Sequence, residues 1–135
     1  MTANAGMKTL YLVLLLATCA CQERKQRVTD TPNAVRDLLI DRSFWQAEKA
    51  NHAQDRITGA HRFVITNTSQ RYGYQHIKIR FDYYDRSYRR IDSAVGFVEQ
   101  AVGPRTAIKI DKLETRLTKP SAITATATVV NAAVD

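Results

Sequence analysis

The sequence predicts an all-β protein: a small antiparallel β-sandwich of about six or seven strands, preceded by a cleaved signal helix and a polar tether. Three observations predict this class. Apolar side chains recur at every second position after Gly59, turn-forming residues separate these segments, and the one long apolar stretch lies near the N-terminus. The 135 residues have room for one hydrophobic core, and an apolar fraction of 44% is typical of a folded protein.

The N-terminal segment has the order of a secretory signal. Lys8 precedes an apolar stretch over residues 10–17, and small residues follow it. This stretch is much shorter than the ~20 apolar residues that span a bilayer, so we expect a cleaved signal over residues 1–20 rather than a transmembrane helix. Met1 and Met7 are both candidate starts, because the residues between them add nothing that a signal requires.

The end of this signal resembles that of bacterial lipoproteins, in which an acylated cysteine becomes the mature N-terminus. Cys19 follows Thr18, whereas Cys21 follows Ala20, whose small side chain suits the tight pocket of a signal peptidase. We therefore expect lipidation at Cys21, with Cys19 as the alternative. Both cysteines of the chain lie at this junction. The domain that follows is thus expected to have no disulfide and no thiolate metal site.

The beginning of the exported part is polar. Residues 22–33 show no apolar periodicity, and we assign residues 21–42 to a lipidated N-terminus, a tether and a short turn or helix. Residues 34–45 fit either a short amphipathic helix or the start of a strand. We expect the first strand around residues 43–49, and hence a sandwich domain over residues 43–135.

Alternation with period two is the clearest structural signal. Between His76 and Tyr84 the apolar residues share one face of a strand and the polar ones the other: Ile77, Ile79, Phe81 and Tyr83 against Lys78, Arg80 and Asp82. Phe63 and Ile65 likewise share a face. The same pattern predicts strands over residues 62–66, 88–99, 106–113 and 123–129. Short strands at this spacing favour an immunoglobulin-like sandwich.

A family resemblance agrees with this fold. The segment Phe81-Asp82-Tyr83-Tyr84-Asp85 resembles the signature of the FxLYD family, small β-sandwich domains of bacterial envelope lipoproteins, with tyrosine in place of leucine at Tyr83. The turn at residues 67–69, the Gly103-Pro104 turn and the last strand, residues 127–132, are also similar, so the resemblance covers residues 43–135. The family's hairpin glycine is replaced by Ser87 or Tyr88. The resemblance implies an accessory, binding role and brings no catalytic residues.

Motifs for catalysis, cofactors or metals are absent from the sequence. His52, His61 and His76 lack the i, i+2 or i, i+4 spacing that aims two imidazoles at one ion. The sequence has no Gly-x-Ser-x-Gly elbow for a serine nucleophile and no glycine-rich phosphate loop. We therefore expect no enzyme activity, no cofactor and no metal.

Two further features are candidate sites. Tyrosines and arginines interleave along the middle of the chain, a mixture suited to stacking and anion contact, and the predicted binding patch comprises Tyr72, Tyr74, Arg86 and Arg89. Asp92-Ser93-Ala94 looks like a three-residue acceptor for bacterial O-glycosylation, which would modify Ser93.

Charge and address limit the partners. The formal net charge is +7, but the basic residues form no run of five or more, and an exported protein does not meet nucleic acid. We expect a lipid-anchored protein of a Gram-negative envelope, on the periplasmic side of the outer membrane, which acts as an accessory or binding module for another envelope protein. The alternative is direct binding of glycan or anionic lipid through the tyrosine and arginine patch. The sequence leaves the oligomeric state open.

Overall fold

The computed structural model describes residues 31–49 and 57–135. They form one short helix, α1 (Ala34–Asp37), and six strands. The strands are β1 (Leu38–Lys49), β2 (Ile57–Asn67), β3 (Tyr74–Tyr84), β4 (Arg90–Val98), β5 (Ala107–Leu117) and β6 (Thr124–Val134). The predicted all-β class is confirmed for this part of the chain. The predicted signal and most of the predicted tether lie outside the described residues.

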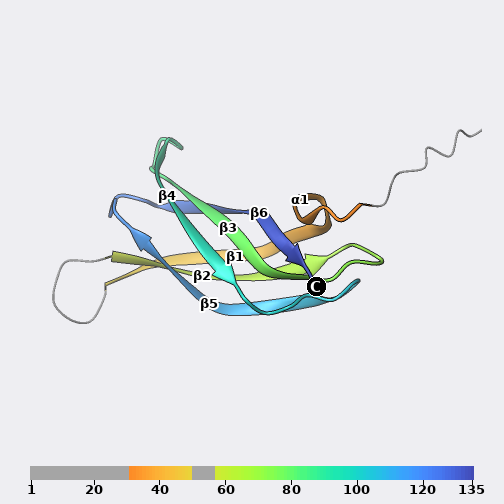
Figure 1. Cartoon of the computed structure of the whole chain (residues 1–135). Helices are drawn as coiled ribbons and strands as arrows, with labels where there is room; N and C mark the ends of the chain where they lie inside the picture. The colour runs from red at the N-terminus through yellow and green to blue at the C-terminus, as the bar shows by residue number, and fades with distance from the viewer. Residues whose placement is uncertain (1–30, 50–56) are drawn as a thin grey trace, which may run out of the picture. The chain divides into compact units, whose positions relative to one another are not determined.

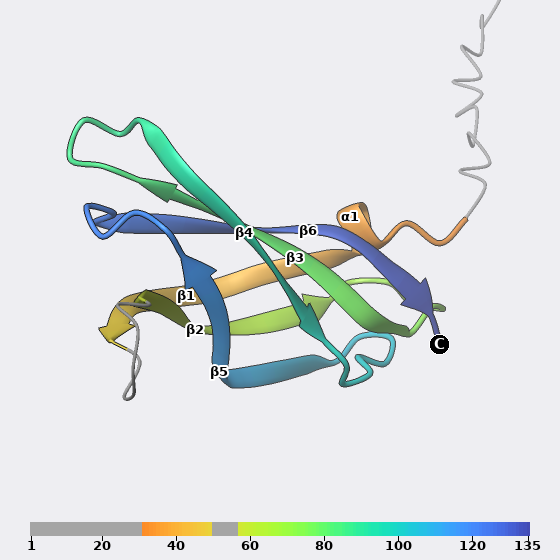
Figure 2. The same ribbon diagram turned by 60° about the vertical axis from the view of Figure 1, so that its left-hand side comes forward.

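The strands form two antiparallel sheets that pack face to face (Figures 1 and 2). One sheet has the order β1-β2-β5, and the other has the order β4-β3-β6. β1 pairs with β2, and β3 pairs with β4, so these consecutive strands stay within one sheet. The connections from β2 to β3, from β4 to β5 and from β5 to β6 cross from one sheet to the other. The central strands are therefore β2 and β3, and the four others are edge strands.

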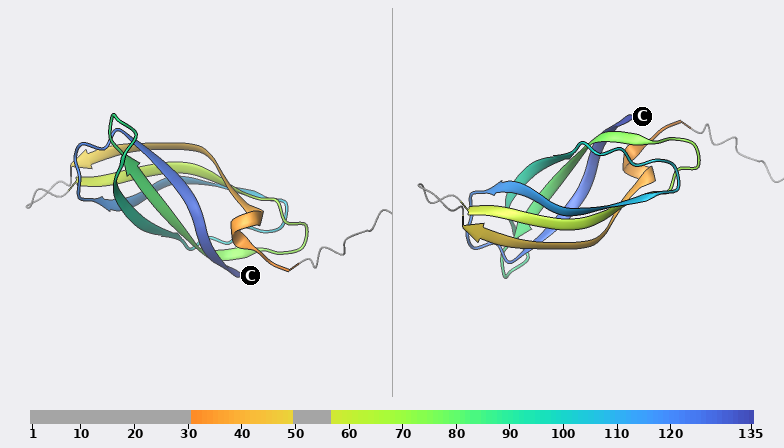
Figure 3. Two further views of the ribbon diagram at one scale, coloured as in Figure 1. Left: turned by 90° about the horizontal axis from the view of Figure 1, so that it is seen from above. Right: turned by 90° about the horizontal axis from the view of Figure 1, so that it is seen from below.

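The connections gather at two ends of the sandwich (Figure 3). At the first, the α1 end, lie α1, residues 68–73, residues 99–106 and the last residue, Asp135. At the opposite end, the turn end, lie the turn at residues 85–89 and the connection at residues 118–123. Strand β3 runs from the α1 end to the turn end.

The core lies between the sheets and is built by the predicted alternation. The four predicted inward residues of β3, Ile77, Ile79, Phe81 and Tyr83, are completely buried. They pack with Phe63 and Ile65 of β2 in one hydrophobic cluster. The last strand is different, because Ile123, expected to be its first inward residue, precedes β6 and is exposed.

The first strand begins earlier than predicted, at Leu38. The side chain of Asn33 caps α1 by accepting a hydrogen bond from the Arg36 backbone N–H, and β1 follows the helix directly. Both Ala34 and Leu38 belong to the core cluster. The folded unit thus includes the segment that the sequence assigned to a short turn or helix after the tether, and it begins before residue 43.

A buried asparagine joins the two connections at the α1 end. The Asn67 side-chain amide donates to the backbone oxygens of Tyr72, Val102 and Gly103 at 2.8, 3.0 and 3.0 Å. Its side-chain oxygen accepts a hydrogen bond from the Ser69 backbone N–H at 2.9 Å. This single side chain therefore holds residues 68–73 against residues 99–106.

A polar cluster is buried in the core between the sheets. The Nε2 atom of His61 lies 2.7 Å from the Tyr83 hydroxyl, which lies 2.5 Å from the Thr115 hydroxyl. The imidazole of His61 stacks on the ring of Phe81 at a centroid distance of 3.8 Å. Burial lowers the pKa of His61 to about 4, because a charged imidazole would lose its hydration there. His61 is thus neutral in the folded protein at neutral pH.

Gly59 makes room for this cluster. A Cβ atom at Gly59 would lie 2.7 Å from the Tyr83 hydroxyl and 3.1 Å from the Thr115 hydroxyl. We expect Gly59→Ala to lower the free energy of unfolding by about 1–3 kcal/mol, since it overpacks a buried hydrogen-bonded site. Urea denaturation followed by circular dichroism measures this. A suitable control is Gly103→Ala, because its Cβ would meet nothing closer than 3.7 Å and the φ of Gly103 is not positive. An equal loss of unfolding free energy in both variants would contradict overpacking as the cause.

Candidate binding surface

The outer face of the β4-β3-β6 sheet carries exposed apolar side chains. Val95 and Phe97 alternate along β4 with residues that face the core, and their relative exposures are 47% and 54%. In the strand register Phe97 pairs with Lys78, and Val95 pairs with Arg80, both on the outer face of β3. Two apolar residues thus lie directly beside two cationic ones. We call Lys78, Arg80, Arg90, Val95 and Phe97 the outer-face surface.

Gly96 explains why the largest residues of β4 point away from the core. A Cβ atom at Gly96 would lie 2.8 Å from Leu113 Cδ2 and 3.2 Å from Phe81 Cε2, so these two side chains already fill the space above the glycine. The inward positions of β4 therefore accept only small residues in the middle of the strand. With Gly96 inside, strand alternation turns Val95 and Phe97 outward.

A buried carboxylate organises the cationic part of this surface. Asp82 is only 5% exposed although it lies on the outer face. Arg80 Nε donates to Asp82 Oδ2 at 3.1 Å, and Arg90 Nη1 lies 3.6 Å from Oδ1. Among the described residues, Oδ1 has no hydrogen-bond partner. One carboxylate thus holds two guanidinium groups next to each other, and together with Lys78 they leave the surface cationic.

The outer face of the other sheet has a different charge balance. Phe44 of β1 is 55% exposed, almost the same as Phe97. Its sheet, however, carries more carboxylates, which pair with two lysines: Lys112 lies 3.0 Å from Glu48 and 2.7 Å from Glu114, and Lys109 lies 2.7 Å from Asp111. Paired, exposed charges are typical of a solvated surface. Phe44 pairs in the strand register with exposed Arg62, so a cation beside an aromatic side chain occurs on both faces. The β4-β3-β6 face differs in having two apolar side chains near two arginines that share one carboxylate.

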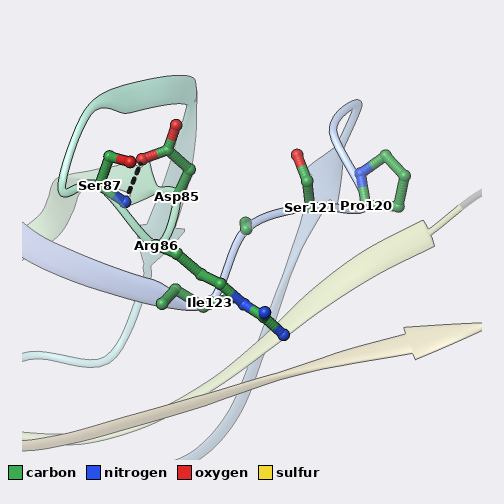
Figure 4. A pocket seen from close by; sticks show the side chains of 7 residues that line it. Asp85, Arg86, Ser87, Pro120, Ser121 and Ile123 are labelled. Carbon is green, nitrogen blue, oxygen red and sulfur yellow. Dashed lines mark hydrogen bonds between the residues drawn. The ribbon is translucent and has the colours of Figure 1, made fainter.

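A shallow depression of about 440 Å³ lies at the turn end (Figure 4). It is lined by Asp85, Arg86, Ser87, Pro120, Ser121, Ala122 and Ile123. Asp85 fixes the turn because its carboxylate accepts hydrogen bonds from the backbone N–H groups of Ser87 and Arg89. The hydrogen bond from the Arg89 backbone is the main cause of a lowered Asp85 pKa. Arg86 extends from this turn, and no described carboxylate forms an ion pair with it.

Tyr88 occupies a left-handed backbone conformation in the same turn, with φ of 55°. Tyr88 is one of the two positions, with Ser87, at which the FxLYD-like pattern led us to expect a hairpin glycine. Its side chain is 81% exposed and is not part of the core. The left-handed region costs an L-residue roughly 1–2 kcal/mol, whereas glycine adopts it freely.

We expect Tyr88→Gly to raise the free energy of unfolding by about 0.5–1 kcal/mol, because relief of this conformation outweighs the added freedom of the unfolded chain. Thermal unfolding measures the change. Ser87→Gly is the control, since Ser87 has no positive φ and its N–H bond to Asp85 would remain. An increase for Ser87→Gly that matches Tyr88→Gly would contradict this reason.

The predicted tyrosine and arginine patch is not a single surface. Tyr74 is buried at the start of β3, where its hydroxyl donates to Asp37 Oδ2 at 2.5 Å, and burial raises its pKa to about 12. Tyr72 is half-buried at the same end. Arg86 and Arg89 follow the other end of β3, a separation of roughly 30 Å for a strand of this length. The prediction that the four share one surface is wrong.

The remaining candidates fall in several environments. His61 lies in the core, the His76 imidazole contacts the Glu99 carboxylate on the surface, and His52 lies outside the described residues. The described residues contain no group of three or more potential metal-ligating side chains. Ser93 is exposed on β4, and its O-glycosylation stays a prediction. Cys19 and Cys21 lie outside the described residues, whose helix is too short to cross a membrane.

Comparisons with known proteins yield no relative. No protein-family model matches the chain, and neither the curated proteins nor the solved structures contain a match. The outer-face surface must therefore be interpreted from its own chemistry. The sequence pattern predicted β4 as a strand, but it did not identify which residues face outward. The alternation of Ala94, Gly96 and Val98 with Val95 and Phe97 was the available signal.

Proposed function

We propose that this protein is a lipid-anchored accessory protein of the bacterial envelope that binds another envelope protein through its outer-face surface. The observation that carries the proposal is the position of exposed Val95 and Phe97 beside the arginines that Asp82 holds. Aromatic residues and arginine are enriched in protein interfaces, where an aromatic anchor fills a pocket on the partner. The cationic charge favours a partner whose pocket is surrounded by acidic groups. The proposed role involves no catalysis.

The strand order supports an immunoglobulin-like domain. In immunoglobulin domains, A, B and E belong to one sheet, and C and F belong to the other, where C′ can be added beside C. The orders β1-β2-β5 and β4-β3-β6 correspond to A-B-E and C′-C-F. Asp85, the last residue of the FxLYD-like segment, fixes the following turn. These observations support the proposed kinship with FxLYD-like envelope domains.

The position of α1 supports an anchor at the N-terminal side of the domain. The described chain begins at Thr31, and α1 packs at the α1 end of the sandwich. Residues between a lipidated Cys21 and Thr31 would span at most ~35 Å when fully extended. Gln22 is not the aspartate that retains many lipoproteins in the inner membrane, and this favours the outer membrane.

Metabolic labelling with a palmitate analogue tests the anchor. We expect label on the full chain and on Cys19→Ala, and loss of the label in Cys21→Ala. Label that depends on Cys19 instead would move the anchor to the alternative cysteine. An unlabelled wild-type chain would exclude lipid anchoring.

Co-purification from solubilised envelopes tests the binding surface. We expect the full-length protein to retain a partner and Phe97→Ser to weaken its binding at least tenfold, since truncation of an interface anchor costs about 2 kcal/mol. Phe44→Ser is the matched control because its exposure is 55% against 54% for Phe97. Higher salt should also weaken the complex. Equal retention by both variants, or no retained partner, would contradict the proposal.

A further inference from the structure

The outer edge of β6 is unpaired in the described part of the chain. β6 forms its backbone ladder with β3 on one side only, since it is the last strand in the order β4-β3-β6. Along such an edge, alternate N–H and C=O groups point outward without a partner strand. The helix α1 lies at the same end of the sandwich as the end of β6 (Figure 3), and β1 also approaches β6, so the part of β6 farthest from α1 is its beginning, from Thr124.

The composition of β6 distinguishes it from the other three edge strands. Its sequence, Thr-Ala-Thr-Ala-Thr-Val-Val-Asn-Ala-Ala-Val, contains no charged residue, no proline and no glycine. Edge strands are normally protected from pairing by charges or bulges. The other edge strands have these devices: β1 has a bulge and charged residues, β5 has five charged residues, and β4 has Arg90 and Asp92. β6 also has a bulge, between Val129 and Asn131, but among the described edge strands it is the one without a charged residue.

We propose that residues 124–130 of β6 pair antiparallel with the same segment of a second copy of this chain. Thr124, Thr126 and Thr128 face outward, whereas Ala125 and Ala127 face the core side. A twofold axis at Thr126 places Thr126 opposite itself and Thr124 opposite Thr128, and an axis at Ala127 places Thr126 opposite Thr128. Threonine pairs across strands are favourable, and an uncharged strand brings no like charges together.

The pairing is compatible with the other surfaces. It would join two three-stranded sheets into one six-stranded sheet, with β4 at each outer edge. Val95 and Phe97 lie on β4, at the opposite side of the sheet from β6, so the outer-face surface would stay accessible. The α1 ends of the two copies would point in opposite directions along the joined sheet. Both lipid anchors would reach the same bilayer if the strands of this sheet lie parallel to the bilayer surface. The inference does not depend on a partner for the outer-face surface.

Photocrosslinking between two differently tagged full-length copies tests the inference. A photoreactive residue at position 126 should give a product that carries both tags. The control is the same residue at position 93, because Ser93 and Thr126 both pair with Asp82 and lie in one row at opposite edges of the sheet. A product from position 126 that contains only a different protein, or no product, would overturn the inference, as would equal two-tag products from both positions.

A charge at the same edge provides the second test. We expect Thr126→Lys to reduce co-purification of the copy that carries the second tag at least tenfold. With the axis at Thr126 the two lysines would face each other, and with the axis at Ala127 each lysine would face Thr128 at an otherwise uncharged edge. Ser93→Lys adds the same charge at the opposite edge and should leave co-purification unchanged. Urea unfolding verifies that both variants are folded. If a folded Thr126→Lys variant still co-purifies the second copy to the same extent, the inference is overturned. If Phe97→Ser still binds its partner, only the proposed function is contradicted.

Discussion

Asn67→Ala is expected to lower the free energy of unfolding by about 3–4 kcal/mol. The side chain is almost fully buried and bonds four backbone groups in two connections. Its removal breaks four hydrogen bonds, and each contributes about 0.5–1.5 kcal/mol. The oxygens of Val102 and Gly103 still accept from the backbone N–H groups of Tyr74 and Thr106. Water that enters the space recovers part of this loss. Urea denaturation at neutral pH measures the difference from the unmodified chain.

Asn131→Ala is the control for this prediction. Asn131 is exposed on β6, and its side-chain oxygen accepts only the adjacent Ala132 backbone N–H. Surface substitutions of this kind usually change stability by no more than about 0.5 kcal/mol. A loss at Asn67 as small as that at Asn131 would mean that the two connections do not depend on the buried amide.

Mild acid should destabilise the protein through His61. The pKa of His61 is about 4 in the folded protein, against about 6.5 in the unfolded chain. The unfolded chain therefore binds the proton first. The stability that a neutral His61 contributes is fully present above pH 6.5 and is lost as the pH falls toward 4. Between pH 7.5 and 4.5 the free energy of unfolding should fall by about 2.5 kcal/mol from this group alone.

Substitution of the histidine isolates its contribution. His61→Gln should lose most of the pH dependence between pH 7.5 and 4.5, whereas His76→Gln, at an exposed position, should keep it. Urea denaturation at the two pH values gives the comparison. Proton titration by NMR offers a check on the unmodified chain, because the His61 ring should remain neutral above pH 5. Protonation of that ring near pH 6.5 in the folded protein would contradict its burial as the cause.

The sequence predicted those parts of the fold that follow from local alternation. Ile77 to Tyr83 and the pair Phe63 and Ile65 show a simple period of two, and their inward faces are as expected. The start of β1 was placed too late because residues 34–45 fit either a helix or a strand. Asp37, just before β1, is buried through a contact far along the chain. Its carboxylate accepts a hydrogen bond from Tyr74, which no local pattern near residue 37 reveals.

The binding surface was harder to predict for the same reason. A hydrophobic residue such as Phe97 is normally assigned to the core, but Gly96 faces the core because Leu113 and Phe81 fill the space above it. Asp82 shows the opposite case, since two arginines bury a carboxylate that alternation places on the exposed face. The patch predicted from interleaved tyrosines and arginines failed because β3 separates its members along its full length.

We propose that the protein binds its partner through the outer face of the β4-β3-β6 sheet. Site-specific photocrosslinking of the full-length protein in living cells tests it most directly, with the photoreactive residue placed at position 97 or, as control, at position 44. The account predicts one envelope protein crosslinked from position 97 and not from position 44, with the product diminished when Lys78 is changed to Glu. Crosslinking of the same protein from position 44 alone, or no product from position 97, would contradict it.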